Sequence, residues 1–512
     1  MVAQITFKKS FALPNSFQDI SSSVQEINDN YFLFGSSFAN KYNSSNYTFD
    51  LSFLKINSIG DTIYSKSLNG VNDLYSVNAN FPTTTQSLKI NSFIYLISCS
   101  YDLIQSKNRY SIFKINNNLD TIWSRKFKPI SSDTLNYSPI AITQKSQNDI
   151  IVLAKAEANV ANIQQVILAD YDSLGNLKWL KKINNPFSQN PSIVPSSLTY
   201  NKTEKMFYLS GYLKGSGYGD WWGNPWPFII KVDSIGNYVW EKHIYQSINN
   251  RHQKNFGIIT TSDNNQIFAG YTVPCADSLY VSGNGFWHHK MPGKPSLTKI
   301  NNSGNVIWRN TFEDTCHSCG DTYFNSLIET YDNKVVAIGN GIVIKNDGSF
   351  DTSNVIVAKL DLNGVVIWKK NYLFCSSLLG DNIWVNEIKQ TLDSGFIITG
   401  SSFCKKFIII KLDKNGCLFS NCPSLINNLN VSVKENNLVE IFPNPTNETI
   451  YIEFKELGYK NIKIQLINTL GQVLMEANQK NILYIKDLPN GIYFVNIFST
   501  NNLIVVKKII KE

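Results

Sequence analysis

Arginine is scarce in this 512-residue chain, which contains only Arg109, Arg125, Arg251 and Arg309. The net charge of +8 comes instead from lysines that are scattered singly along the sequence. A surface that binds nucleic acid needs clustered basic residues, preferably arginine, and the sequence contains no such cluster. The composition therefore argues against a nucleic-acid partner.

Long apolar runs are also missing. No stretch reaches the roughly 18 to 20 apolar residues that a helix needs to cross a bilayer, so we expect no transmembrane segment. The start, "MVAQITFKKSF", lacks the basic region and apolar core of a secretory signal peptide. If the protein is exported, we expect its precursor to carry a signal that this sequence does not include.

What the chain does contain is typical of β-rich globular structure. Hydrophobic residues make up 43% of the sequence, aromatic residues 13% and charged residues only 17%. A chain of this length exceeds what a single core usually serves, so two domains or a repeat architecture are expected.

A repeat is visible over most of the chain. Seven segments share an apolar alternating run, a turn with Asp or Asn usually followed by Gly, and a second run that usually carries Trp and Lys. They begin at Phe53, Ile112, Leu168, Ile229, Leu297, Val357 and Ile408. Gly tolerates positive φ and Asx side chains bond their own backbone, so each segment predicts a β-hairpin.

A second hairpin precedes each of these, as in "SLIETYDNKVVAIGN" from Ser326. Two hairpins give four strands, the content of one blade of a β-propeller. The seventh unit lacks its last strand, and "AQITFKKSF" from Ala3 matches the missing piece. We therefore predict an all-β fold in which residues 1–418 form a seven-bladed β-propeller, closed by an N-terminal strand near Ile5 to Lys9.

The repeats resemble the "KLDxxGxxxWxK" propellers of secreted and surface proteins of Bacteroidota. That resemblance identifies a scaffold and not an activity.

The character of the sequence changes after Cys417. Residues 419–437 read as a polar linker, and residues 438–512 contain three strand–turn–strand blocks, which predict a small immunoglobulin-like β-sandwich. These blocks carry "FPNP", "LINTLGQVL", "LPNGIYFV" and "KKIIK" in that order. The motif residues are Phe442, Pro443, Asn444, Pro445, Gly471, Pro489, Asn490, Gly491, Tyr493, Lys507 and Lys508.

This ordered set resembles the type A C-terminal sorting domain of the type IX secretion system of Bacteroidota. The resemblance implies an exported protein, secreted or held at the outer cell surface after passing through the periplasm. It also implies two partners for the C-terminal domain, namely the outer-membrane translocon and the sorting peptidase.

Three long connections predict the functional face of the propeller. They run from Leu213, Val273 and Asn310, belong to blades 4 to 6, and should be neighbours. Their aromatic and polar side chains are candidates for binding sugar rings or peptides. The candidates are Asp220, Trp221, Trp222, Trp226, Trp287, His288 and His289. These tryptophans could instead pack the connections onto the blades.

Most of the eight cysteines also fall in the connections between strands or at the end of the predicted ring. The eight are Cys99, Cys275, Cys316, Cys319, Cys375, Cys404, Cys417 and Cys422. Disulfide bonds in an oxidising compartment are the favoured use. Metal binding by Cys316, His317, Cys319 and a histidine of the preceding connection is the alternative, but a second Cys-x-x-Cys pair is missing. We predict no metal and no cofactor.

No catalytic constellation is recognisable. Asp220, Asp314, Asp321 and Asp381 are available acids, but nothing in the sequence pairs them. The prediction is a non-catalytic extracellular module that binds a glycan, a matrix component or a protein. The alternatives are a secreted polysaccharide-degrading enzyme, as a glycoside hydrolase or lyase, and a structural scaffold of a cell-surface assembly.

Overall fold

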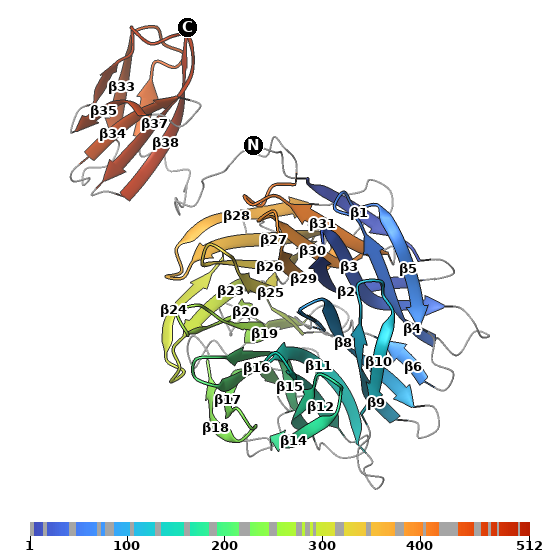
Figure 1. The fold of residues 1–512 in the computed structure, drawn as a ribbon. Helices are drawn as coiled ribbons and strands as arrows, with labels where there is room; N and C mark the ends of the chain where they lie inside the picture. The colour runs from blue at the N-terminus through green and yellow to red at the C-terminus, as the bar shows by residue number, and fades with distance from the viewer. Residues whose placement is uncertain are drawn as a thin grey trace. The chain divides into compact units, whose positions relative to one another are not determined.

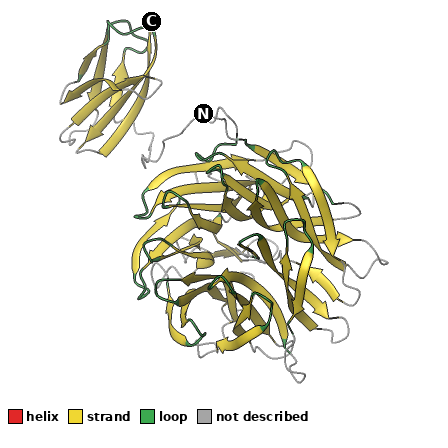
Figure 2. Cartoon of the chain, in the orientation of Figure 1, coloured by secondary structure: helices red, strands yellow, loops and turns green. Residues whose placement is uncertain are grey.

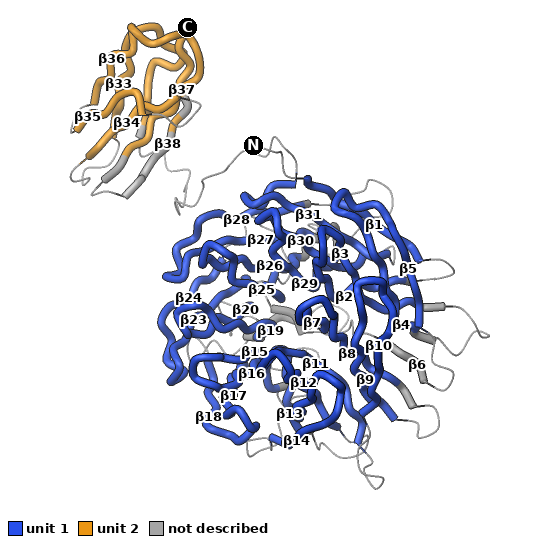
Figure 3. The backbone as a smooth tube through the Cα atoms, viewed as in Figure 1, with its two compact units in different colours: residues 1–425 blue, residues 426–512 orange. Residues whose placement is uncertain are grey.

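The structure of the chain is a computed structural model with two compact units, Met1–Leu425 and Ile426–Glu512 (Figure 3). It describes residues 5–13, 18–39, 48–68, 73–76, 86–102, 107–127, 135–157, 164–183, 192–214, 226–244, 253–272, 279–281, 287–289, 293–312, 322–344, 350–373, 383–402, 406–418, 439–454, 462–468, 473–478, 481–499 and 502–512. The predicted linker, 419–437, lies outside these residues. Strands and turns make up the described ranges (Figure 2), and no helix that could cross a membrane occurs in them. The all-β prediction is confirmed.

In the described part of the first unit, seven antiparallel sheets of four or five strands form one blade each, and the innermost strand of each blade packs against those of its neighbours. Blade 1 is β2 (Gln18–Ile27), β3 (Asn30–Ala39), β4 (Thr48–Ile56) and β5 (Thr62–Leu68). Blade 2 has β6 (Asp73–Ser76) and β7 (Ser87–Ile90), then β8 (Phe93–Asp102), β9 (Lys107–Ile115) and β10 (Thr121–Lys126). Blade 3 is β11 (Asn136–Gln144), β12 (Asp149–Glu157), β13 (Gln164–Asp172) and β14 (Leu177–Ile183).

The next three blades follow the same order. Blade 4 is β15 (Ser192–Asn201), β16 (Met206–Lys214), β17 (Trp226–Asp233) and β18 (Tyr238–His243). Blade 5 is β19 (Gln253–Thr260), β20 (Gln266–Thr272), β23 (Lys294–Ile300) and β24 (Val306–Thr311), with a hairpin of β21 (Leu279–Val281) and β22 (Trp287–His289) inserted. Blade 6 is β25 (Tyr323–Glu329), β26 (Lys334–Ile344), β27 (Phe350–Asp361) and β28 (Val366–Leu373).

Blade 7 combines the two ends of the repeat region. Its inner strands are β29 (Ile383–Gln390), β30 (Phe396–Ser402) and β31 (Phe407–Leu412), and its outer strand is β1 (Phe7–Phe11). Phe7 pairs with Lys411 and Phe11 with Phe407. The predicted closure by an N-terminal strand is confirmed, although the strand begins and ends two residues later than Ile5 to Lys9.

The inner strands pack side by side and form a closed ring (Figure 1). Each junction between neighbouring blades has its own apolar core. For example, Ile151 and Leu153 of blade 3 pack with Phe207 and Leu209 of blade 4 in one fully buried cluster. The ring is thus held by seven cores between blades, so each blade depends on both neighbours.

The turn glycines hold adjacent blades together at the rim. Gly236 has a φ of 82°, and a Cβ at this position would lie 2.7 Å from Cγ of Lys181 and 2.9 Å from Cζ3 of Trp179 in the previous blade. Both the backbone conformation and the space therefore require glycine. The repeated Trp of the outer strand packs on the turn of the next blade in this way at Gly175, Gly236, Gly304, Gly364 and Gly416. A lysine joins it at Gly236 and Gly304, and Arg125 joins it at Gly175.

The same contact closes the ring. Phe7 and Lys9 lie against Gly60 of blade 1, where a Cβ would lie 2.8 Å from Cε2 of Phe7, and Nζ of Lys9 is 2.7 Å from Oδ1 of Asp61. Phe7 therefore occupies the place of the repeat's tryptophan. Leu119 is the exception among the turns, because it adopts a φ of 66° with its side chain fully buried.

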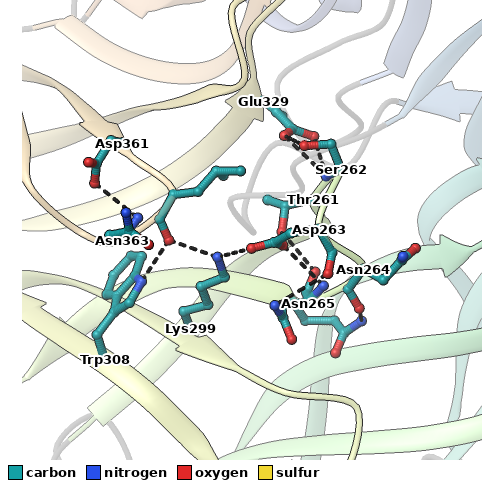
Figure 4. A network of polar contacts seen from close by, with 12 residues as sticks. Thr261, Ser262, Asp263, Asn264, Asn265, Lys299, Trp308, Glu329, Asp361 and Asn363 are labelled. Carbon is teal, nitrogen blue, oxygen red and sulfur yellow. Dashed lines mark hydrogen bonds and ion pairs between the residues drawn. The ribbon is translucent and has the colours of Figure 1, made fainter.

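Buried lysines tie the other set of turns to the blades. Lys299 on β23 is 3% exposed, pairs with Asp263, and donates to the Leu362 carbonyl of blade 6 at 2.7 Å (Figure 4). Nε1 of Trp308 donates to the same carbonyl at 3.0 Å. Burial raises the pKa of Asp263, but donation from Lys299, Thr261 and Asn265 more than offsets it, so the pKa lies below its ordinary value.

A carboxylate reaches back across this junction. Glu329 of blade 6 accepts from the Ser262 backbone N–H at 2.8 Å and from its hydroxyl at 2.6 Å (Figure 4). Between blades 6 and 7, the Gln390 side chain accepts from the Tyr331 N–H. Between blades 7 and 1, where the ring closes, Glu26 accepts from the Leu392 N–H. Many polar groups on the face that carries these short turns, which we call the turn face, are thus committed to holding blades together.

Six inner strands carry a one-residue bulge, at Ser22, Ile140, Ser196, Phe256, Asn325 and Asn386. In blade 2 the inner edge is formed by two strands, since β6 and β7 both pair with β8. Bulged side chains also link blades, because Ser196 Oγ donates to the Asn255 carbonyl at 2.7 Å and Asn386 Nδ2 to the Ser21 carbonyl at 2.7 Å. The repeat in the sequence predicts neither feature.

The C-terminal unit is a small sandwich of two sheets around one core. One sheet contains β32 (Val439–Phe442), β33 (Thr449–Phe454) and β36 (Ile482–Tyr484). The other contains β35 (Val473–Asn478), β34 (Ile462–Asn468), β37 (Gly491–Ser499) and β38 (Asn502–Lys511). This arrangement agrees with the predicted C-terminal β-domain.

Candidate functional site

The three long connections predicted to be neighbours start from adjacent places in the structure. The first lies between β16 and β17, the second between β20 and β23, and the third precedes β25. In antiparallel blades these strand ends lie on the face opposite the short turns. We call this face the loop face.

An aromatic cluster joins the bases of these connections. Phe256, the bulged residue of β19, contacts Tyr212 near the end of β16 (ring centroids 6.5 Å apart), Tyr271 near the end of β20 (6.2 Å) and Tyr323 at the start of β25 (5.1 Å). Each tyrosine borders a different connection. The predicted convergence of the three connections is therefore confirmed at their bases.

The cluster is a buried floor and not an exposed surface. Phe256, Tyr212 and Tyr271 are buried together with Val194, and Tyr323 packs against them half-buried. Burial raises the pKa of Tyr212 to about 12, so its hydroxyl stays protonated at neutral pH. Aromatic pairs of this kind stabilise by roughly 0.5–1.5 kcal/mol each beyond their area burial, so the floor fixes where the connections leave the blades.

The predicted ligand-binding residues belong to the connections whose bases this floor joins. Asp220, Trp221 and Trp222 lie outside the described residues. Trp226 opens β17 and pairs in register with Leu213, next to Tyr212. Trp287, His288 and His289 form β22, the second strand of the inserted hairpin. The positions of these strands are described and the side chains are not, so the proposed platform stays a prediction.

Sequence reasoning missed the four aromatic residues of the floor. Tyr212, Phe256, Tyr271 and Tyr323 come from three blades and share no motif, and each resembles an ordinary strand residue. The signal that could have found them is positional, because each tyrosine borders a long connection.

Two cysteines, Cys99 and Cys417, lie in the described part of the chain. Burial raises the pKa of Cys99 to about 12. Cys417 is buried, and its Sγ lies 2.8 Å from Nζ of Lys370. The other six cysteines lie outside the described residues, so the disulfide prediction is untested there. No group of His, Cys, Asp or Glu side chains in the described ranges is arranged to hold a metal ion.

The sorting-motif residues have definite places in the C-terminal unit, apart from Gly471, which lies outside the described residues. Phe442 ends β32, and the Phe442–Pro443 and Asn444–Pro445 peptide bonds that follow are cis. Pro489 and Asn490 precede Gly491 and Tyr493 of β37, while Lys507 and Lys508 lie on β38.

Comparison with known families identifies this unit. Residues 440–512 match the family model described as a secretion system C-terminal sorting domain. The predicted sorting domain is confirmed, and the chain is a cargo of that secretion system. No curated protein matches the sequence.

Solved structures similar to the chain include the β-propeller domain of the Trilobed protease from Pyrococcus furiosus, 7% identical, covering 80% of this chain and 99% of that chain with a TM-score of 0.39. The α-L-arabinofuranosidase Arb93A from Fusarium graminearum is 10% identical, with coverage of 70% and 98% and a TM-score of 0.40. The α-L-arabinanase from Penicillium chrysogenum is 12% identical, with coverage of 71% and 95% and a TM-score of 0.37. Similarity at this level carries no information on activity.

Proposed function

We propose that this secretion-system cargo is a non-catalytic binding protein whose propeller holds a glycan, matrix or protein ligand on its loop face outside the cell. The observation that supports the proposal is the aromatic floor, in which one residue, Phe256, contacts the bases of all three long connections. A rigid scaffold that gathers variable connections in one place is a common design for recognition.

The distribution of polar contacts favours the same face. Lys299, Glu329 and their counterparts commit much of the turn face to contacts between blades. Trp221, Trp222, Trp226 and Trp287 all belong to connections that start from the floor, and stacking on aromatic side chains suits sugar rings as well as peptide side chains. The ligand is therefore assigned to blades 4 to 6.

The test is retention of the full chain on a panel of insoluble polysaccharides, with the supernatant assayed for newly released reducing ends. The Trp221→Ala/Trp222→Ala variant should lose at least tenfold in retention. Tyr331→Ala is the matched control, because Tyr331 is an exposed aromatic residue on a turn of the opposite face. It should bind like the parent protein.

Release of reducing ends would overturn the non-catalytic assignment in favour of the polysaccharide-degrading alternative. Equal retention of both variants would move the site away from the tryptophan connections. If no polysaccharide retains the chain, the glycan class is excluded, and the same pair of variants is then compared on immobilised extracellular proteins.

A further inference from the structure

The C-terminal unit has one sheet face that exposes large aromatic side chains. In β33, Ile450 and Ile452 point into the core, and the alternation of a strand places Tyr451 on the outside. Leu483 of β36 is buried in the same core, so its neighbours Ile482 and Tyr484 face outward as well. The outer face of β32, β33 and β36 is thus defined by register.

An aromatic row occupies this outer face. Phe442 stands opposite Tyr451, and the two rings stack with centroids 5.9 Å apart at 21°. Ile482 is the partner of Tyr451 on the other side, and Tyr484 lies two residues further along β36. Phe442, Tyr451 and Tyr484 are 46%, 44% and 69% exposed. We call Phe442, Tyr451 and Tyr484 the aromatic row.

The fold of the unit does not account for this exposure. Other motif residues have a clear structural contact, since Asn444 Oδ1 accepts from the Ile510 N–H at 2.8 Å and the Tyr493 hydroxyl donates to the Pro489 carbonyl at 2.6 Å. Phe442 belongs to the same motif, but its ring lies at the surface. Contiguous exposed apolar side chains usually mark a place where another molecule binds.

The charges around the row indicate what kind of surface fits it. Glu440 and Glu453 stand directly opposite each other next to the Phe442–Tyr451 pair, and both are exposed. Two carboxylates beside an aromatic row match a partner that brings aliphatic side chains to the rings and a lysine or arginine to the rim.

We propose that the aromatic row is the surface by which the secretion machinery's receptor reads this sorting domain. The receptor surface is predicted to be aliphatic with a basic rim. This inference rests on the proposed function, because it needs the chain to be an exported cargo. Within the FPNP motif, the proposal gives Asn444 a structural role and Phe442 a role in recognition.

The test is export of the full chain, preceded by a signal peptide, in a bacterium that has this secretion system. The fraction of the protein outside the cell is compared with the fraction kept in the periplasm. Tyr451→Thr/Tyr484→Thr should lower the exported fraction at least tenfold, since it removes two of the three exposed rings but keeps residues that suit strands. Its melting temperature should equal that of the parent chain within a few degrees.

Glu476→Thr/Asn478→Thr is the matched control, because both side chains are exposed on β35 of the other sheet and lie outside the four motifs. This variant should be exported within twofold of the parent chain. Equal impairment of the control, or normal export of the tyrosine variant, would overturn the proposal. Self-association of the parent chain that disappears in the tyrosine variant would assign the row to a second copy instead.

Deletion of residues 439–512 separates this proposal from the one on which it rests. If the deletion abolishes export while the tyrosine variant is exported normally, the chain is a cargo and the recognition surface lies elsewhere. If the deleted chain is still exported, both proposals fail.

Discussion

Phe7 offers a direct test of how the ring closes. Its side chain lies against Gly60, stands 6.4 Å from the Tyr31 ring between centroids, and packs half-buried on the core between blades 7 and 1. Replacing a fully buried phenylalanine by alanine costs about 3–5 kcal/mol, so a half-buried one should cost about 2 kcal/mol. Phe7→Ala should therefore destabilise the whole propeller, although it lies only seven residues from the start of the chain.

The assay is unfolding followed by tryptophan fluorescence. All ten tryptophans lie before residue 425, so the signal reports the propeller and not the C-terminal unit. For a unit of this size, about 2 kcal/mol corresponds to a fall of roughly 2–3 °C in the melting temperature. If the propeller unfolds as one unit, the fall in melting temperature should be the same at every emission wavelength used to follow the tryptophans.

Tyr64→Ala is the matched control, because Tyr64 holds the same repeat position on β5, opposite Lys55, but is about half exposed. It should cost less than about 0.5 kcal/mol. Equal effects of the two substitutions, or no effect of Phe7→Ala, would refute the closure of the ring by β1 in solution.

Three further predictions concern the blades. Lys299→Met should cost about 2–3 kcal/mol, because it leaves the partly buried Asp263 without its cation. The pKa of Asp263 is lower in the folded than in the unfolded protein. The ionised carboxylate therefore stabilises the fold above the unfolded pKa near 4, and this stabilisation is lost as the pH falls through the folded pKa. Because Lys299→Met removes the cause of the lowered pKa, the variant's stability should depend less on pH in acid than that of the parent protein. Gly236→Ala should cost about 1–2 kcal/mol from its positive φ alone, measured by denaturant unfolding. Cys99, with a pKa near 12, should resist alkylation at pH 8 until the protein unfolds, as measured by mass spectrometry.

The repeat could be predicted from the sequence because its signal is chemical and local. A turn such as that at Gly236 must have a residue that accepts positive φ, and strand alternation gives the flanking residues. The reason for the tryptophans is not local. Trp179 is needed because of a glycine in the next blade, 57 residues later, and only the assembled ring brings the two together.

The candidate site was harder to predict for the same reason. The sequence could identify three long connections and their order, and hence that they should be neighbours. It could not identify Phe256 as the residue on which they converge, because a bulge on an inner strand has no fixed residue type, as Ser22 and Ile140 at equivalent places demonstrate. Packing in three dimensions decides that position.

The C-terminal unit presents the converse case, because a motif can be recognised without revealing what each residue does. Asn444 bonds to the Ile510 N–H and so ties the motif to the last strand, whereas Tyr484 lies outside the four motifs and is largely exposed. Asn444→Ala should lower both stability, by about 1 kcal/mol for the lost hydrogen bond, and export. Tyr484→Thr should lower export without changing the melting temperature of the C-terminal unit, followed by calorimetry. If both variants lose export only in proportion to lost stability, then the unit is read through its fold and not through the aromatic row.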